Sequence, residues 1–182
     1  LGNGELTPVY MCLDNRLSST LKPLNTMNAA GAEVLVELKS QSSQLDNIHG
    51  LEKVDLLVLD NKFDLAPVFQ YGSRILQECL TVEVKITFAN THQGQMSLDA
   101  IGSVLAHSGF NFHSFTDVEY SAPKVFANAE PLASTQMVSA KAIFIPGEHR
   151  LCNLSSAQHE KLAFIMHVVY LSLIHISEPT RH

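Results

Sequence analysis

Three titratable side chains near the middle of the chain are placed to take a proton from a bound molecule. Asp60 ends the apolar run VDLLVLD (residues 54–60), Asp64 follows four residues later, and His92 comes after a second apolar run, VEVKITF (residues 82–88). A carboxylate or an imidazole acts as a general base when it lies within hydrogen-bonding reach of the proton that it removes. Asp60, Asp64 and His92 are therefore the candidate catalytic residues.

Each of these side chains also has a structural interpretation, which stays open. Asp60 can close a turn. Asp64 is favoured as a helix cap over a base, since Pro67 after it fits a first helical turn. His92, in a loop, would ordinarily be a solvated surface residue. The other histidines show neither H-E-x-x-H nor Cys/His ligand spacing, so no metal site is predicted, and no G-x-S-x-G sequence supports a serine hydrolase.

The two apolar runs are the elements that must position these side chains. Each is short, rich in Val, Ile and Leu, and continuous rather than alternating, which favours a strand covered on both faces in a parallel sheet. In open α/β sheets the ligand lies just beyond the carboxyl ends of such strands. This predicts that Asp60 and the loop after Phe88 share one functional rim.

The rest of the chain predicts an α/β domain, because strand and helix patterns alternate along it. A helix is expected after Asp64, a second from Ser97 to a stop at Gly109, and a third after the capping-box sequence Ser155-x-x-Gln158. Further strands are expected in residues 8–14, 31–38, 110–115 and 142–145, and a loop or irregular excursion in residues 121–136.

Composition sets limits on the function. The 182 residues are 46% hydrophobic and 16% charged, which is typical of one globular domain. The net charge of −6 and the absence of a Lys/Arg block argue against a nucleic-acid surface. Three cysteines without C-x-x-C spacing favour reduced thiols in the cytoplasm.

An ordered series of motifs resembles the carboxyl-terminal half of the FkbM family of methyltransferases. The motifs are VDLLVLD, QYGSRIL, VEVKITFANTHQGQ, LAHSGFNFHSF, KAIFIPG and SSAQHEKLAFIMHVVY, and together they cover roughly residues 33–170. The resemblance implies a truncated Rossmann-like methyltransferase sheet that lacks the N-terminal strands carrying the cofactor loop. It also implies that the parent protein uses S-adenosylmethionine to methylate a hydroxyl group of a sugar or small natural product. We expect neither a nucleic-acid nor a membrane partner, because of the net charge and the shortness of the apolar stretch in residues 162–176.

Some positions match the family's motifs and others do not. Asp60 matches the Asp that ends the family's central strand. Thr87, Gln93, Gly94 and Gln95 fall in the stretch that the resemblance assigns to substrate or cofactor binding, and of these Gly94 and Gln95 match the family's Glu-Gly-Gln loop.

Three positions that are acidic in the family are Leu65, Lys85 and Lys141 here. These departures favour a second hypothesis, a non-catalytic binding or scaffolding domain attached to another enzyme such as a glycosyltransferase. If the two lysines lie side by side in the sheet, their charges need partners, and Asp60 or Asp64 can supply one.

Both ends of the chain have unusual sequences. The chain begins with Leu1 rather than Met, and residues 171–181, LSLIHISEPTR, resemble the translation of an adapter used in sequencing libraries. We expect residues 1–170 to be a partial FkbM-like domain and residues 171–182 to be non-native read-through. The alternative, an apolar helix over residues 162–176, is short for a membrane span and carries His167 and His175.

Overall fold

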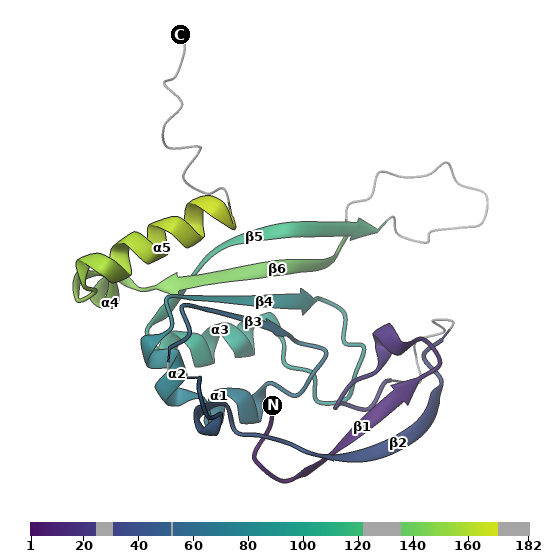
Figure 1. The fold of residues 1–182 in the computed structure, drawn as a ribbon. Coiled ribbons are helices and arrows are strands. Elements are labelled where there is room, and N and C mark those ends of the chain that lie inside the picture. Colours follow the sequence, from purple (N-terminus) through teal and green to yellow (C-terminus); the bar gives the residue numbers. More distant parts are fainter. Residues whose placement is uncertain (25–30, 52, 122–135, 171–182) are drawn as a thin grey trace, which may run out of the picture.

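The part of the chain that the structure describes forms a four-stranded mixed sheet with helices on both sides and a separate two-stranded hairpin (Figure 1). The computed structural model describes residues 1–24, 31–51, 53–121 and 136–170, so the predicted excursion in residues 121–136 and the terminal residues 171–182 lie almost wholly outside it. The strands are β1 (Leu6–Cys12), β2 (Val34–Gln41), β3 (Leu56–Asp60), β4 (Thr81–Thr87), β5 (Phe110–Ser121) and β6 (Gln136–Pro146). The α-helices are α1 (Ala66–Gln70), α2 (Ser73–Glu78), α3 (Leu98–His107), α4 (Glu148–Cys152) and α5 (Ser156–Val168).

The two central strands are parallel neighbours. In the order β3-β4-β6-β5, β3 pairs with β4 in parallel, with Leu56 opposite Thr81 and Asp60 opposite Lys85. Strand β6 runs antiparallel to both β4 and β5. The prediction of two adjacent parallel strands is therefore confirmed, and their carboxyl ends meet at one edge.

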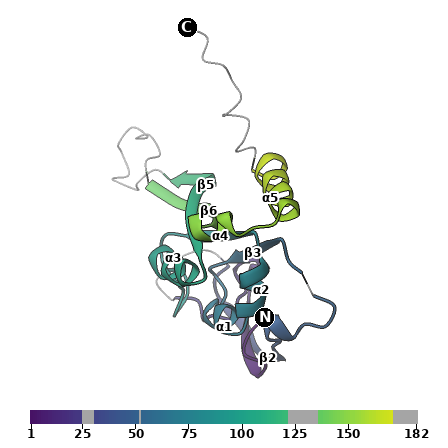
Figure 2. The same cartoon turned by 90° about the vertical axis from the view of Figure 1, so that its left-hand side faces the viewer.

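The main core lies between this sheet and helices α1, α2 and α3. Val82, Val84 and Ile86 of β4 point into it and are at most 1% exposed. The period of two along β4 follows from the pleat, which sends alternate side chains to opposite faces. Figure 2 shows α5 on the other side of the sheet from these helices.

Strand β3 is covered on one face only, which corrects the prediction of coverage on both. Leu57 and Leu59 are buried, whereas Val58 between them is 59% exposed. The physical reason is its position at the edge of the described sheet, combined with the limited reach of α5. That helix packs through Leu162 and Met166 against Leu80, next to the start of β4.

Helix boundaries follow local chemistry. The predicted capping box is confirmed, because the Ser155 side chain accepts from the Gln158 N–H and the Gln158 side chain accepts from the Ser155 N–H. Val169, which follows the last residue of the same helix, is 48% exposed. The helix predicted after Asp64 is two short helices, which meet at Gly72.

The hairpin of β1 and β2 is antiparallel and forms its own two-stranded sheet. Residues 13–24 then return from β1 toward the four-stranded sheet, beginning with a 3-10 helix at Asn15–Leu17. Strand β2 is exposed along almost its whole length. Within the described residues, no helix is both long and apolar enough to cross a bilayer.

Candidate functional site

A pocket of about 520 Å³ opens beside the carboxyl ends of β3 and β4. This is within the range of sites that hold small molecules, roughly 300–1,000 Å³. Its walls combine apolar side chains with carboxylates and lysines. The residues that matter for the argument are Val58, Asp60, Phe63, Asp64, Lys85 and Lys141.

The structure brings two of the three predicted catalytic residues into this pocket. Asp60 is half-buried at the end of β3, and its Oδ1 accepts from the Lys62 N–H at 3.0 Å. Asp64 lines the same pocket, and its Oδ1 accepts from the Ala66 N–H at 3.2 Å. Each carboxylate therefore stabilises a turn with one oxygen while lining the wall of the pocket.

The two lysines lie directly opposite each other on β4 and β6. The Lys141 ammonium is 2.6 Å from Asp117 Oδ2 and 3.8 Å from Glu83 Oε1, and the hydrogen bond to Asp117, followed by the charge of Glu83, raises the pKa of Lys141. Asp60 and Asp64 were the expected partners, and neither pairs with a lysine among the ion pairs of the described residues.

A bulge in β5 explains this choice of partner. The register against β6 shifts between Thr116 and Glu119, and Asp117 within the bulge has a φ of 48°. A bulge re-aims side chains by inserting a residue into one strand. Here it brings the Asp117 carboxylate into contact with Lys141. Both residues line a second, smaller hollow of about 210 Å³, together with Glu83 and Tyr170.

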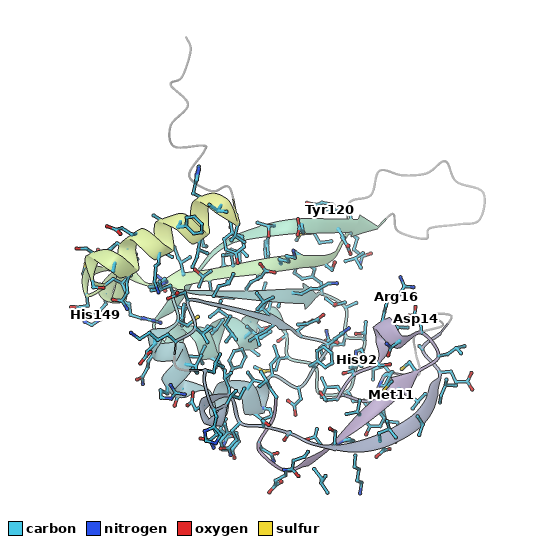
Figure 3. The ribbon with its side chains drawn as sticks, in the orientation of Figure 1. Met11, Asp14, Arg16, His92, Tyr120 and His149 are labelled. Atoms are coloured by element: carbon cyan, nitrogen blue, oxygen red, sulfur yellow. The ribbon has the colours of Figure 1, made fainter. Side chains whose placement is uncertain are left out.

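His92, labelled in Figure 3, is buried and contacts the segment that leaves the hairpin. It does not line the pocket. Its Nε2 is 3.4 Å from the Leu17 carbonyl oxygen and its Nδ1 is 2.8 Å from the Thr91 hydroxyl. Burial lowers the pKa of His92, which favours the neutral ring. A surface position, the structural alternative, is not what the structure shows.

Gln95 closes the loop after β4. Its Oε1 accepts from the N–H groups of Thr91 and His92 at 2.9 and 3.2 Å, and its Nε2 donates to the Thr87 carbonyl at 3.3 Å. Gln95 is 9% exposed, so both ends of its amide are engaged inside the protein. Asn61, the residue after Asp60, donates to the same Thr87 carbonyl as Gln95. Gln95 and Asp60 therefore lie at the same edge of the sheet.

The remaining predicted binding residues lie in the same loop or, in the case of Thr87, at the end of β4. Gly94 has a φ of +73°, a left-handed conformation that favours glycine. Gln93 is exposed and donates its backbone N–H to the Lys22 carbonyl at 2.8 Å. The Thr87 N–H is donated to Asn61 Oδ1 at 3.0 Å. None of these three lines the pocket beside Asp60.

Sequence reasoning missed Asn61. Its side chain is 1% exposed, accepts from the Thr87 N–H and donates to the carbonyls of Met96 and Thr87 at 3.1 and 3.4 Å. It therefore ties the end of β3 to the end of β4. The feature of the sequence that could have pointed to it is an amide side chain directly after a buried strand. At that position the side chain can replace the backbone hydrogen bonds that the two strands no longer form.

It also missed the rim segment, residues 16–24, which crosses the carboxyl ends of both strands. The Ser19 hydroxyl donates to the Lys62 carbonyl at 2.5 Å, and the Leu24 N–H donates to the Thr91 carbonyl at 2.9 Å. The Lys62 ammonium returns a hydrogen bond to the Arg16 carbonyl at 3.0 Å. These contacts are mostly with backbone carbonyls, so side-chain types gave little sign of them.

Comparison of the chain with known protein families, with characterised proteins and with solved structures found no match. Among the described residues, no group of three His, Cys, Asp or Glu side chains is arranged to hold a metal ion.

Proposed function

We propose that the chain is the carboxyl-terminal part of a methyltransferase that uses S-adenosylmethionine to methylate a hydroxyl group of a sugar or small natural product. The observation that carries this is the placement of Asp60 and Asp64 in one pocket at the carboxyl ends of two parallel strands. This is the edge where α/β sheets bind ligands. The motif resemblance supplies the reaction type.

The residues of the pocket fit part of the cofactor. The carboxylate of Asp64 can accept hydrogen bonds from ribose hydroxyls, and Val58 and Phe63 offer apolar surface to an adenine base. No glycine-rich turn follows a strand in the described residues, so the methionine end has no equivalent cradle there. The 182-residue chain alone is therefore expected to bind the cofactor too weakly to measure.

The proposed chemical role of this chain is to remove the proton from the acceptor hydroxyl group. When bound, the cofactor supplies an electrophilic methyl group, whose transfer leaves the electrons of the broken carbon–sulfur bond on sulfur. Asp60 is the proposed base: one carboxylate oxygen is held by the Lys62 N–H, and the carboxylate takes the acceptor proton as the new carbon–oxygen bond forms. The pocket walls hold the acceptor in line, which is the larger part of such catalysis.

The test is made on the protein expressed from its full reading frame. We expect calorimetry to show micromolar binding of S-adenosylmethionine, and Asp60→Asn to lower kcat by about 10²–10⁴-fold with the Kd close to that of the unchanged protein. Glu160→Gln, an exposed position on α5, is the matched control and should leave both values unaltered. Unchanged turnover in Asp60→Asn would refute the assignment of the base.

A second candidate function is a non-catalytic binding or scaffolding domain. It is supported by the structural roles of the residues that stand where the family has acidic ones. Leu65 is 2% exposed in the core, and Lys141 is neutralised by Asp117 and Glu83. His92 and Gln95 are engaged in holding their own loop. Carbohydrate binding by the full protein without S-adenosylmethionine binding would favour this alternative.

We further propose a cytoplasmic location for either function. Cys12 and Cys79 are free and buried and Cys152 is free and exposed, an arrangement suited to a reducing compartment. Burial raises the pKa of the Cys79 thiol to about 11, which keeps it protonated and unreactive.

A further inference from the structure

The outer edge of β2 carries backbone groups that point away from the molecule. Tyr10 of β1 exchanges backbone hydrogen bonds with Ser19, at 2.8 and 3.1 Å, on the side of β1 that faces away from β2. Its partner in the hairpin, Glu37, is therefore in a pair that exchanges no hydrogen bonds with β1. It follows that Glu37, and its neighbours two residues away along the strand, direct N–H and C=O groups to the free edge.

This edge of β2 has no pairing strand in the described residues and carries exposed apolar side chains. In the described residues β2 pairs with β1 alone. Leu35, Val36 and Leu38 are 62%, 46% and 49% exposed. Natural proteins usually shield such an edge, because it is a template for another strand. A two-stranded hairpin is also marginally stable by itself.

The charges on the edge select the partner. Glu37 and Lys39 flank Leu38, both are exposed, and neither takes part in an ion pair of the described residues. If a second, identical strand pairs antiparallel about Leu38, each Glu37 lies opposite a Lys39. Centring the pairing on Glu37 or on Lys39 would instead place like charges opposite each other, which is destabilising.

The backbone geometry allows the same register. Glu37 and Lys39 both direct their hydrogen-bonding groups outward, so they can form hydrogen-bonded pairs across the new interface. Leu38, whose groups point to β1, would then face its symmetry mate in a non-hydrogen-bonded pair, where side chains approach most closely. One two-fold axis through the Leu38 pair satisfies both the charge pairing and the hydrogen-bond directions. An isologous dimer has such an axis.

We propose that two copies of this chain associate through β2, in an antiparallel pairing centred on Leu38 that joins their hairpins into one four-stranded sheet. No residue of β2 lines the pocket beside Asp60, so the inference does not depend on the proposed function. Pairing centred on Leu38 places Leu35 opposite Gln41 and so covers seven residues of each strand, a small interface, and we therefore expect a weak, concentration-dependent dimer.

Sedimentation equilibrium of the 182-residue chain tests the association. The expected result is a mass that rises with concentration from 20.0 kDa toward twice that value. Glu37→Lys should raise the dimer Kd roughly tenfold, because it places lysines opposite each other in both symmetric pairs. The swap Glu37→Lys with Lys39→Glu should restore the Kd of the unchanged chain. A monomer at every concentration, or a swap that fails to restore association, would overturn the proposal.

Cross-linking tests the register. In a Cys152→Ser background, which removes the exposed thiol, Leu38→Cys should form an intermolecular disulfide on mild oxidation, since facing non-hydrogen-bonded residues lie about 4.5 Å apart between Cα atoms. Ser40→Cys is the matched control, since it would lie opposite Val36 and far from its own mate. Equal cross-linking of the two variants would show that the pairing is not centred on Leu38.

Discussion

At the scale of single residues, Asp60 and Asn61 do different work although they are adjacent. Asp60 faces the pocket and keeps its side chain half-exposed, whereas Asn61 is buried and joins the ends of β3 and β4 through three hydrogen bonds. Successive residues leaving a strand point in opposite directions, so a single dipeptide can serve both the site and the scaffold.

His92 gives the first prediction, which concerns pH. Burial lowers the pKa of His92 below its ordinary 6.5, so the unfolded chain binds a proton at a pH where the folded chain does not. The stability due to the neutral ring is fully present above the unfolded pKa and is lost as the pH falls toward the folded pKa. The free energy of unfolding, measured in urea, should therefore decline below pH 6.5 more steeply in the unchanged chain than in His92→Gln.

The control for this prediction is His167→Gln, because His167 is exposed on α5. Its pH dependence should follow that of the unchanged chain, including the decline that buried or paired carboxylates cause. If His92→Gln shows the same slope as the control, the ring is not held neutral in the folded state.

At the scale of elements, two glycines in helical surroundings should respond oppositely to alanine. At Gly72, between α1 and α2, an added Cβ would lie 2.5 Å from the Val68 carbonyl oxygen and 2.7 Å from Leu45 Cδ2. Such overlap costs about 1–3 kcal/mol. Gly102 lies inside α3 with only Phe144 at 4.0 Å, so alanine should stabilise there by roughly 0.5–1 kcal/mol. Thermal unfolding of Gly72→Ala and Gly102→Ala measures both, and destabilisation of similar size in the two would contradict the packing argument.

The elements that the sequence predicted well are those fixed by local chemistry. The Ser155 capping box, the stop of α3 at Gly109 and the two strand segments β3 and β4 each rest on a pattern within a few residues. The parallel pairing of β3 with β4 joins more distant residues, and it was predicted from the continuous apolar runs. Which faces of a strand are covered depends on tertiary packing, which the local sequence pattern does not reveal. The apolar run of β3 indicates a strand but cannot reveal that Val58 lies at an edge without a cover.

The candidate site was predictable to a similar extent. The rule for strand ends predicted that Asp60 and the loop after Phe88 share one rim. Asp60 and Asp64 line one pocket, whereas no residue of the loop after Phe88 lines it. The partner of Lys141 was not predictable, because Asp117 reaches it through a bulge that depends on the pairing of β5 with β6. The burial of His92 was missed because the rim segment that covers it lies about 75 residues earlier and contacts it through a backbone carbonyl.

At the scale of the whole molecule, the hairpin and the four-stranded sheet should differ in local stability. Strand β4 lies between two partners with Val82, Val84 and Ile86 fully buried, whereas β2 has one partner and is exposed. Amides exchange according to the free energy of the opening that exposes them. Hydrogen exchange on the Glu37→Lys variant, chosen to keep the chain monomeric, should show β2 amides exchanging at least tenfold faster than those of β4. Equal protection would mean that the hairpin unfolds only together with the sheet.

The rim segment has a consequence for how such a protein can change its ligand. It is bonded both to the turn after β3, through Ser19, and to the loop after β4, through Leu24, so it fixes the distance between that turn and that loop. One of its residues, Thr20, also lines the pocket. Residues upstream of the sheet thereby act as a spacer for the mouth of the cavity. Altered ligand preference can then arise from substitutions at a distance, with every wall residue left as it is.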